Sequence, residues 1–220
     1  MFFNENSRVK IPALLHLLRL GYTYIPLKQH NHREDTNIFG DIFIESLQRI
    51  NPYVTEEDLY RTLDEISLEL DNEDLGKTFY QHLTATSGIK LIDFTDFNNN
   101  SFHVTTELTY KNGDDEFRPD ITLLINGMPL AFIEVKKPHN KEGIIAERNR
   151  INGRFKNKYF RRFVNITQLM VFSNNMEYED EIVEPILGAY YATSSYTDLS
   201  FNYFREDEEY PVNQHLRPIT

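Results

Sequence analysis

Apolar residues between positions 8 and 85 recur every three or four residues, which is the period of an α-helix with one buried face. In residues 8–20 this stripe accompanies Pro12, which suits a first helical turn, and stops at Gly21, where a helix commonly ends. The apolar positions of this segment are Ile11, Leu14, Leu15 and Leu18. The pattern therefore predicts a first helix over residues 8–20, followed by a polar loop over residues 28–37.

Three more helices are predicted in the same part of the chain. Residues 40–50 have a helical pattern that ends before Pro52, a residue that a helix rarely continues through. Thr55 and Asp58 resemble a capping box that opens the next helix. The apolar stripe of that helix consists of Leu59, Leu63, Ile66 and Leu70. A shorter helix is expected over residues 72–85.

Beyond residue 88 apolar and polar residues alternate, which is the period of a half-buried β-strand. The alternation predicts strands over residues 88–94 and 101–110. The segment FRPDITLLINGMPLAFIEVKKPH, residues 117–139, supplies two more strands. A helical or mixed segment is expected over residues 142–163, and another buried strand over residues 167–175.

The order of these elements indicates the fold class. Helices come first, then a run of strands, then a helix and a further strand, and residues 179–195 are expected to form a helix or a loop. This order is typical of an α+β domain in which helices pack around a mixed sheet.

Three ionisable residues, Asp120, Glu134 and Lys136, interrupt two otherwise apolar strands, although burying a charge without a partner is costly. Glu134 and Lys136 are two positions apart, so both side chains leave the same face of their strand. A hairpin through the intervening Asn-Gly turn signal brings Asp120 back beside Glu134. Because opposed residues of a hairpin share a face, this pairing requires either a three-residue loop over residues 126–128 or a bulge.

Two carboxylates beside a lysine offer the hard oxygen ligands that Mg²⁺ prefers. A metal held there can lower the pKa of a bound water and polarise a phosphodiester, while Lys136 orients the water or stabilises the developing charge. Such a site suits hydrolysis of a nucleic-acid backbone. The alternative interpretation is a cross-strand ion pair that has only a structural role.

Composition and charge restrict these functions further. The chain has 220 residues, of which 40% are hydrophobic, and no stretch approaches the length of a membrane span, so we expect a soluble protein. It has no cysteine, which makes a reducing cytoplasm the simplest location. The formal net charge of −11 excludes a surface that is basic all over, as a protein sheathed in nucleic acid requires.

Positive charge is nevertheless concentrated in one stretch of the sequence. Residues 148–162 contain basic residues and no acid, whereas residues 55–75 and 177–184 are strongly acidic. The basic residues are Arg148, Arg150, Arg154, Lys156, Lys158, Arg161 and Arg162. As a set they predict contact with DNA phosphates, and the alternative is a solvated helix face whose aromatic residues anchor it to the core.

The spacing of Pro119-Asp120 and Glu134-Val135-Lys136 is similar to the signature of PD-(D/E)XK nucleases. The longer string LIDF, NNNSFHV and RPDITLLINGMPLAFIEVKKP resembles, more narrowly, the N-terminal endonuclease domain of the restriction subunit (HsdR) of type I restriction-modification enzymes. The resemblance extends through GYTYIPL and SLQRINP on one side and GAYYATSS on the other, so it covers nearly the whole chain.

The resemblance implies a restriction-endonuclease-like fold, with a mixed β-sheet core flanked by helices. It implies that Asp120, Glu134 and Lys136 form a catalytic set that uses Mg²⁺, or Mn²⁺ in its place, to cut double-stranded DNA. Asp120 and Glu134 would hold the metal. Glu5 is the acid in the neighbourhood where an upstream helix of the superfamily often adds a third contact.

The same resemblance implies how the chain is organised and what it works with. Residues 1–90 would form the N-terminal helical part, residues 91–185 the catalytic core, and residues 186–220 an extension leading to an absent DNA translocase. ATP would act only through that motor. The implied partners are double-stranded DNA and the modification and specificity subunits of a cytoplasmic complex, without any membrane.

One departure from the family leaves alternatives open. The family often carries a Gln-x-x-x-Tyr motif on the helix after the lysine strand, and here Arg148 and Asn152 stand near those positions. A catalytically silent nuclease-like fold, which serves as a DNA-binding or subunit-docking module, is one alternative. A stand-alone repair or recombination nuclease that needs neither ATP nor partners is the other.

Overall fold

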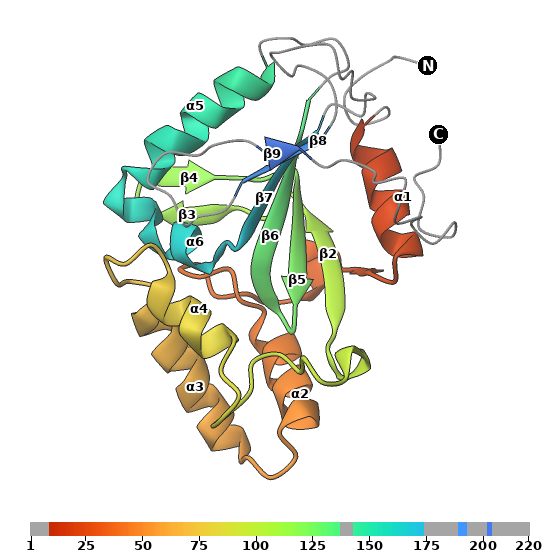
Figure 1. Cartoon of the computed structure of the whole chain (residues 1–220), viewed down its shortest axis with the longest axis vertical. Helices are drawn as coiled ribbons and strands as arrows, with labels where there is room; N and C mark the ends of the chain where they lie inside the picture. Colours follow the sequence, from red (N-terminus) through yellow and green to blue (C-terminus); the bar gives the residue numbers. More distant parts are fainter. Residues whose placement is uncertain (1–8, 137–142, 174–188, 193–201, 204–220) are drawn as a thin grey trace.

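The computed structural model describes residues 9–136, 143–173, 189–192 and 202–203, which form a mixed sheet surrounded by helices (Figure 1). Within these residues the sheet has seven strands in the order β1-β2-β5-β6-β7-β8-β9. They are β1 (Thr23–Tyr24), β2 (Phe102–Thr106), β5 (Ile121–Ile125), β6 (Met128–Val135), β7 (Leu169–Ser173), β8 (Ala189–Ala192) and β9 (Asn202–Tyr203). The pairs β1–β2 and β6–β7 are parallel and the other neighbours antiparallel, so the predicted α+β class with a mixed sheet is confirmed.

The helices cover the sheet in three groups (Figure 1). The α-helices are α1 (Ile11–Arg19), α2 (Gly40–Ile50), α3 (Glu56–Glu69), α4 (Lys77–Leu83), α5 (Gly143–Phe155) and α6 (Arg161–Ile166). Short 3₁₀ turns are η2 (Leu27–Gln29), η3 (Phe97–Asn99) and η4 (Lys158–Phe160). Helices α2, α3 and α4 lie together at one end of the central strands, α5 and α6 lie on one side, and α1 lies on the opposite side.

Helix α3 forms where capping and periodicity predict it. The Thr55 hydroxyl accepts a hydrogen bond from the Asp58 amide at 3.2 Å, which satisfies one of the free N–H groups of the first turn. The whole predicted stripe of this helix is buried, and it packs with α2, α4 and the start of β6 into one apolar cluster. The stripe residues are Leu59, Leu63, Ile66 and Leu70.

A tight turn joins β5 to β6 and packs closely against the start of α2. Asn126 and Gly127 have φ angles of 51° and 79°, as a two-residue primed turn requires, and Ile125 pairs with Met128. A Cβ on Gly127 would lie 2.6 Å from the carbonyl oxygen of Phe39, so only glycine fits there. The side chain of Asn126 is fully buried, but its polar atoms form hydrogen bonds. Its Oδ1 accepts from the Ser101 amide and its Nδ2 donates to the Leu91 carbonyl oxygen, at 2.8 Å each.

A β-bulge in the β5–β6 hairpin decides the orientation of the ionisable residues. Leu124 pairs with Pro129, but Leu123 pairs with Ala131, so β6 carries one extra residue. Beyond the bulge Ile121 lies opposite Ile133, and therefore Asp120 reaches the position beside Glu134. Of the two arrangements that the sequence left open, the bulge is confirmed and the three-residue loop is wrong.

Three predictions of local structure are wrong. Residues 88–94 form bends rather than a strand, because their apolar residues Leu91 and Ile92 pack into the cluster under α2–α4 without pairing to a strand. The predicted strand 101–110 stops at Thr106, since Glu107 has a φ of 57°, and a separate hairpin of β3 (Tyr110–Asn112) and β4 (Asp115–Phe117) follows. Within residues 179–195, where a helix or loop was expected, β8 extends the sheet beyond β7.

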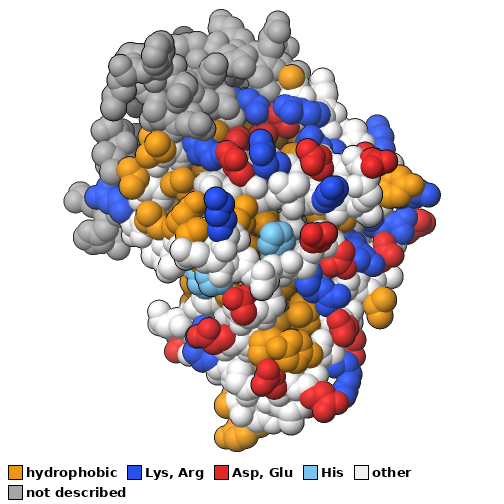
Figure 2. Space-filling view, turned by 180° about the vertical axis from the view of Figure 1, so that it is seen from behind, with side chains coloured by type: hydrophobic (Ala, Val, Ile, Leu, Met, Phe, Trp, Pro, Cys, Tyr) orange, Lys and Arg blue, Asp and Glu red, His pale blue; other side chains and the backbone are white. Residues whose placement is uncertain are grey.

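Helix α1 forms where it was predicted, but of its predicted apolar face only Leu14 packs against the core, and the other three positions are wrong. Leu17 is buried against the sheet, whereas Ile11, Leu15 and Leu18 are 50%, 48% and 41% exposed. Figure 2 shows apolar side chains on the surface at this edge of the molecule. The buried residues of the helix pack against strands β2, β5 and β6, and periodicity alone did not identify this side. None of the helices in the described residues is both long enough and apolar enough to span a bilayer.

Candidate active site

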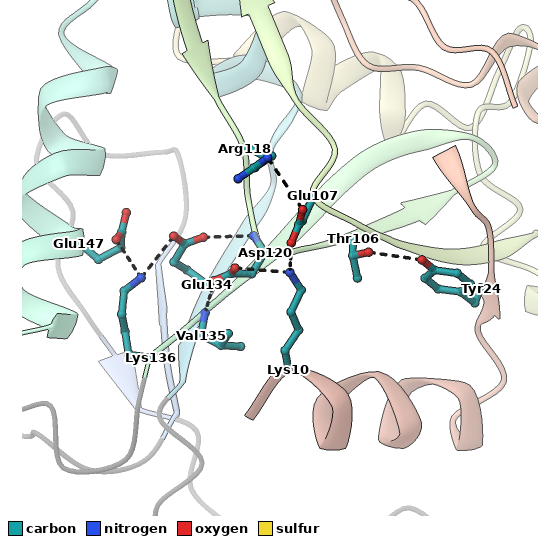
Figure 3. Close-up of polar contacts among 10 residues, drawn as sticks. All are labelled: Lys10, Tyr24, Thr106, Glu107, Arg118, Asp120, Glu134, Val135, Lys136 and Glu147. Carbon is teal, nitrogen blue, oxygen red and sulfur yellow. Dashed lines mark hydrogen bonds and ion pairs between the residues drawn. The ribbon is translucent and has the colours of Figure 1, made fainter. Parts of the chain in front are cut away.

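Asp120, Glu134 and Lys136 meet at the end of the sheet opposite the Asn126-Gly127 turn (Figure 3). Asp120 directly precedes β5, Glu134 lies near the end of β6, and Lys136 directly follows β6. The Val135 amide donates to Oδ2 of Asp120 at 3.0 Å, and the Asp120 amide donates to Oε2 of Glu134 at 3.3 Å. The backbone of each strand therefore donates a hydrogen bond to the carboxylate from the other strand. The predicted convergence of the three side chains is observed.

The carboxyl group of Glu134 has a strongly raised pKa. Its side chain is 8% exposed, and burial raises its pKa to about 7; Lys136 lowers the pKa, while Asp120 and Glu147 raise it. Burial disfavours the carboxylate, and the neighbouring acids oppose a further negative charge. A divalent cation between Asp120 and Glu134 would relieve that repulsion.

The Lys136 ammonium group lies between two acids. Its Nζ atom is 3.4 Å from Oε1 of Glu134 and 3.1 Å from Oε2 of Glu147. Burial lowers the pKa of Lys136, but Glu134 and Glu147 raise it by more, so the net shift is upward. Lys136 is thus held as a cation at the edge of the carboxylate pair.

Glu147 on α5 is a site residue that the sequence analysis missed. Its carboxylate is fully buried and, besides Lys136, forms ion pairs with Arg150 and Arg154. The available signal was its spacing, because Glu147, Arg150 and Arg154 are three and four residues apart and share one helical face.

A second basic residue, Lys10, contacts the pair from the opposite side. Lys10 lies immediately before α1, and its Nζ atom is 2.8 Å from Oε1 of Glu107 and 3.7 Å from Oδ1 of Asp120. The hydrogen bond from Lys10, with its charge, lowers the pKa of Glu107. Figure 3 shows Lys10 and Lys136 approaching the two carboxylates from different elements.

The basic run is divided between two parts of the fold. Arg150 and Arg154 lie on α5 near Lys136, and Arg154 also stacks 3.8 Å above the ring of Phe117. Lys156 follows α5, and Lys158 begins η4 with its Nζ atom 5.4 Å from the centre of the Tyr159 ring. Arg148 is also on α5, although its side chain is outside the described part of the structure.

The two arginines at the end of the run pair with acids that are distant in sequence. Arg161 Nη2 is 2.5 Å from Glu73, and Arg162 Nη1 is 2.5 Å from Asp35. The carboxylate of Asp71 forms longer ion pairs with both arginines, with nitrogen–oxygen distances of 3.9 Å and 3.8 Å. Charges that are separated along the sequence are therefore interleaved in the fold, as Figure 2 shows for one face.

The site fits a metal ion that takes oxygen ligands. Asp120 and Glu134 provide two converging carboxylates, and no group of three or more histidine, aspartate or glutamate ligands occurs among the described residues. Mg²⁺ is suited to such a site because it retains several water ligands and often binds only one or two carboxylates. Glu5, the other predicted ligand, lies outside the described residues.

Comparison with known proteins identifies the family. Residues 2–179 match the family described as the type I restriction enzyme R protein N terminus, and the chain belongs to this family. A protein of Methanocaldococcus jannaschii, named as the MjaIXP type I restriction enzyme endonuclease subunit, is 32% identical over 203 residues, covering 79% of this chain and 19% of the relative. The MjaVIIIP endonuclease subunit of the same organism is 33% identical over 119 residues, covering 52% of this chain and 11% of that relative. The chain thus spans about a fifth of the length of the first relative.

Proposed function

We propose that this chain is the nuclease domain of a type I restriction enzyme and that it cleaves double-stranded DNA with Mg²⁺, for which Mn²⁺ can substitute. Family membership supports a restriction endonuclease role. The observation that carries the proposal is the reciprocal bonding of Asp120 and Glu134 across β5 and β6, with the Lys136 ammonium 3.4 Å from Glu134. An architectural domain has no need for this costly arrangement of buried charges.

Each residue of the site has a separate role in the proposed reaction. Asp120 and Glu134 would hold the metal, which when bound supplies a Lewis acid and lowers the pKa of its water. Lys136 is a fixed cation that orients the attacking water or stabilises charge on the phosphate. Glu147 holds Lys136 in place at 3.1 Å, and so acts as a positioning residue.

The basic residues of α5 are the best placed to hold the DNA backbone beside this site. Arg150 has a side chain that is 56% exposed, and it shares Glu147 with Lys136. We include the rest of the basic run in the DNA-binding set, with Arg161 and Arg162 exchanging their acidic partners for phosphates. Such contacts would position the duplex without reading its sequence.

The wider complex follows from the family. We propose that modification and specificity subunits select the DNA in the cytoplasm. ATP would act through motor domains of a longer subunit rather than through this chain. Cleavage by this chain alone would then be weak, and strong cleavage without ATP or partners would favour a stand-alone nuclease.

Mn²⁺ binding to the 220-residue chain, measured by electron paramagnetic resonance, tests the proposal. We expect saturable binding that Asp120→Asn abolishes while the circular dichroism spectrum stays unchanged. Asp114→Asn, an exposed acid in the β3–β4 turn, is the matched control and should bind like the unaltered chain. If the folded chain binds no Mn²⁺, or if Asp120→Asn binds it normally, the site is not a metal-dependent nuclease centre. That result would favour a catalytically silent DNA-binding or subunit-docking module.

A further inference from the structure

The Lys10 ammonium is buried at the site although the proposed chemistry does not use it. Its side chain is only 8% exposed, and its position just before α1 brings it to the side of Asp120 that is away from Lys136 (Figure 3). A buried ammonium group requires an acidic partner, and Lys10 has two within 4 Å. The two contacts are unequal, at 2.8 Å to Glu107 and 3.7 Å to Asp120.

Glu107 is fixed next to Asp120 by its backbone. It adopts a φ of 57°, which a glutamate rarely does, and its amide donates to the carbonyl oxygen of Asp120 at 3.2 Å. Arg118 gives further support, with Nη1 3.9 Å from Oε2 of Glu107. Glu107 therefore anchors Lys10 close enough for its charge to act on Asp120, but slightly withdrawn from it.

We propose that Lys10 is a built-in counter-ion of Asp120 that weakens the binding of divalent cations, and that Glu107 limits this competition by holding Lys10 back. This inference depends on the proposed function, because it assigns Asp120 as a metal ligand. An ammonium group near that carboxylate repels an incoming divalent ion, and the repulsion is strong where solvent is largely excluded. Lys136 is not equivalent, since it pairs with Glu134 and Glu147 on the other flank.

The proposal predicts opposite effects for the two members of the pair. Lys10→Gln removes the competing charge and should tighten Mn²⁺ binding by about tenfold. Glu107→Gln deprives Lys10 of its nearer partner, so that Lys10 moves to Asp120 and Mn²⁺ binding weakens several-fold. The double variant should regain most of the affinity that Glu107→Gln loses, because the part of that loss that acts through Lys10 disappears with the lysine. Lys10→Arg keeps the charge and should restore weak binding.

Electron paramagnetic resonance titration of the 220-residue chain with Mn²⁺ alone measures all of these affinities. Unchanged or weaker binding by folded Lys10→Gln would overturn the proposal, since a purely structural Lys10 predicts that result. If Lys10→Gln does not fold, Lys10→Met decides, since it removes the charge with little change in length: tighter binding supports the proposal, and unchanged or weaker binding overturns it. An unaltered chain that binds no Mn²⁺ is a separate result, because it contradicts the proposed function itself.

Discussion

The two ends of strand β6 are both buried, but they are built from opposite kinds of side chain. At its start Met128 and Leu130 pack into the apolar cluster under α2–α4. Near its end Glu134 is buried, and its carboxylate lies close to Asp120 and Lys136, with Glu147 on the other side of Lys136. One end stabilises the fold, and the other concentrates charge that the fold must hold in place.

The comparison shows how the same strand serves stability and chemistry. The one buried polar side chain in the β5–β6 turn, Asn126, has its hydrogen bonds satisfied by main-chain groups and by Asn100. The carboxylate of Glu134, in contrast, is held with its pKa raised to about 7 by burial first, with Asp120 and Glu147 adding to the effect. Apolar packing at one end therefore offsets electrostatic strain at the other, and substitutions at the two ends should have different consequences.

The largest expected effect is loss of cleavage at the charged end without loss of fold. In the assembled restriction enzyme, Asp120→Asn should reduce DNA cleavage at least about a thousandfold, or about 4 kcal/mol of activation free energy. The melting temperature should be nearly unchanged, because the asparagine can still accept from the Val135 amide. Plasmid cleavage and differential scanning calorimetry measure the two quantities, and residual activity above a few per cent would remove Asp120 from the catalytic set.

The apolar end should show the reverse behaviour. Leu59→Ala empties a fully buried position in the cluster that packs on Met128 and should lower the free energy of unfolding by about 2–5 kcal/mol. Leu68→Ala on the same helix changes a side chain that is 70% exposed, and should cost less than about 0.5 kcal/mol. Urea unfolding measures the free energy of unfolding of both variants. Equal decreases would mean that the apolar cluster does not provide the stability assigned to it.

The raised pKa of Glu134 predicts a gain in stability when its charge is removed. Between the ordinary value of 4.5 and about 7, Glu134 is protonated in the folded chain and ionised in the unfolded chain. Folded-state stability therefore falls as pH rises through this window, and above it the cost reaches about 3 kcal/mol at most. Glu134→Gln should raise the free energy of unfolding by about 1–3 kcal/mol at pH 8, with the gain disappearing toward pH 4.5. Urea unfolding at both pH values tests this sign, and a gain only at low pH would contradict it.

The smallest expected effect is that of Glu147→Gln, which should act through Lys136. Loss of the 3.1 Å ion pair frees the Lys136 side chain, and cleavage should fall about tenfold, or about 1.4 kcal/mol. Because Glu147 raises the pKa of Glu134, the pH at which Mn²⁺ binding is half-maximal should also decrease. If the charge of Glu147 does not act on Glu134, that pH should stay unchanged. Glu116→Gln, at the exposed position of strand β4, is the control for both measurements.

The sequence by itself determined the local elements and the identity of the central trio. Thr55, the stripe of α3 and the Asn126-Gly127 turn are local signals, and each depends on residues a few positions apart, so each could be identified without a fold. The sequence also predicted that the side chains of Asp120 and Glu134 lie on the same face of the hairpin, through either a bulge or a three-residue loop. Strand parity restricts the register in this way even before the strands are placed.

Only the tertiary structure decided the bulge, the absence of a strand at residues 88–94, the buried side of α1, and the contacts of Lys10, Glu107 and Glu147. Lys10 and Asp120 are distant in sequence, and nothing local marks them as partners. Apolar periodicity reports that a residue will be buried but not what it will contact, and the partner of a buried charge is set by the packing of whole elements. For that reason the sequence identified the three ionisable residues that converge, while the charged residues that contact them became visible only when α1 and α5 were placed against the sheet.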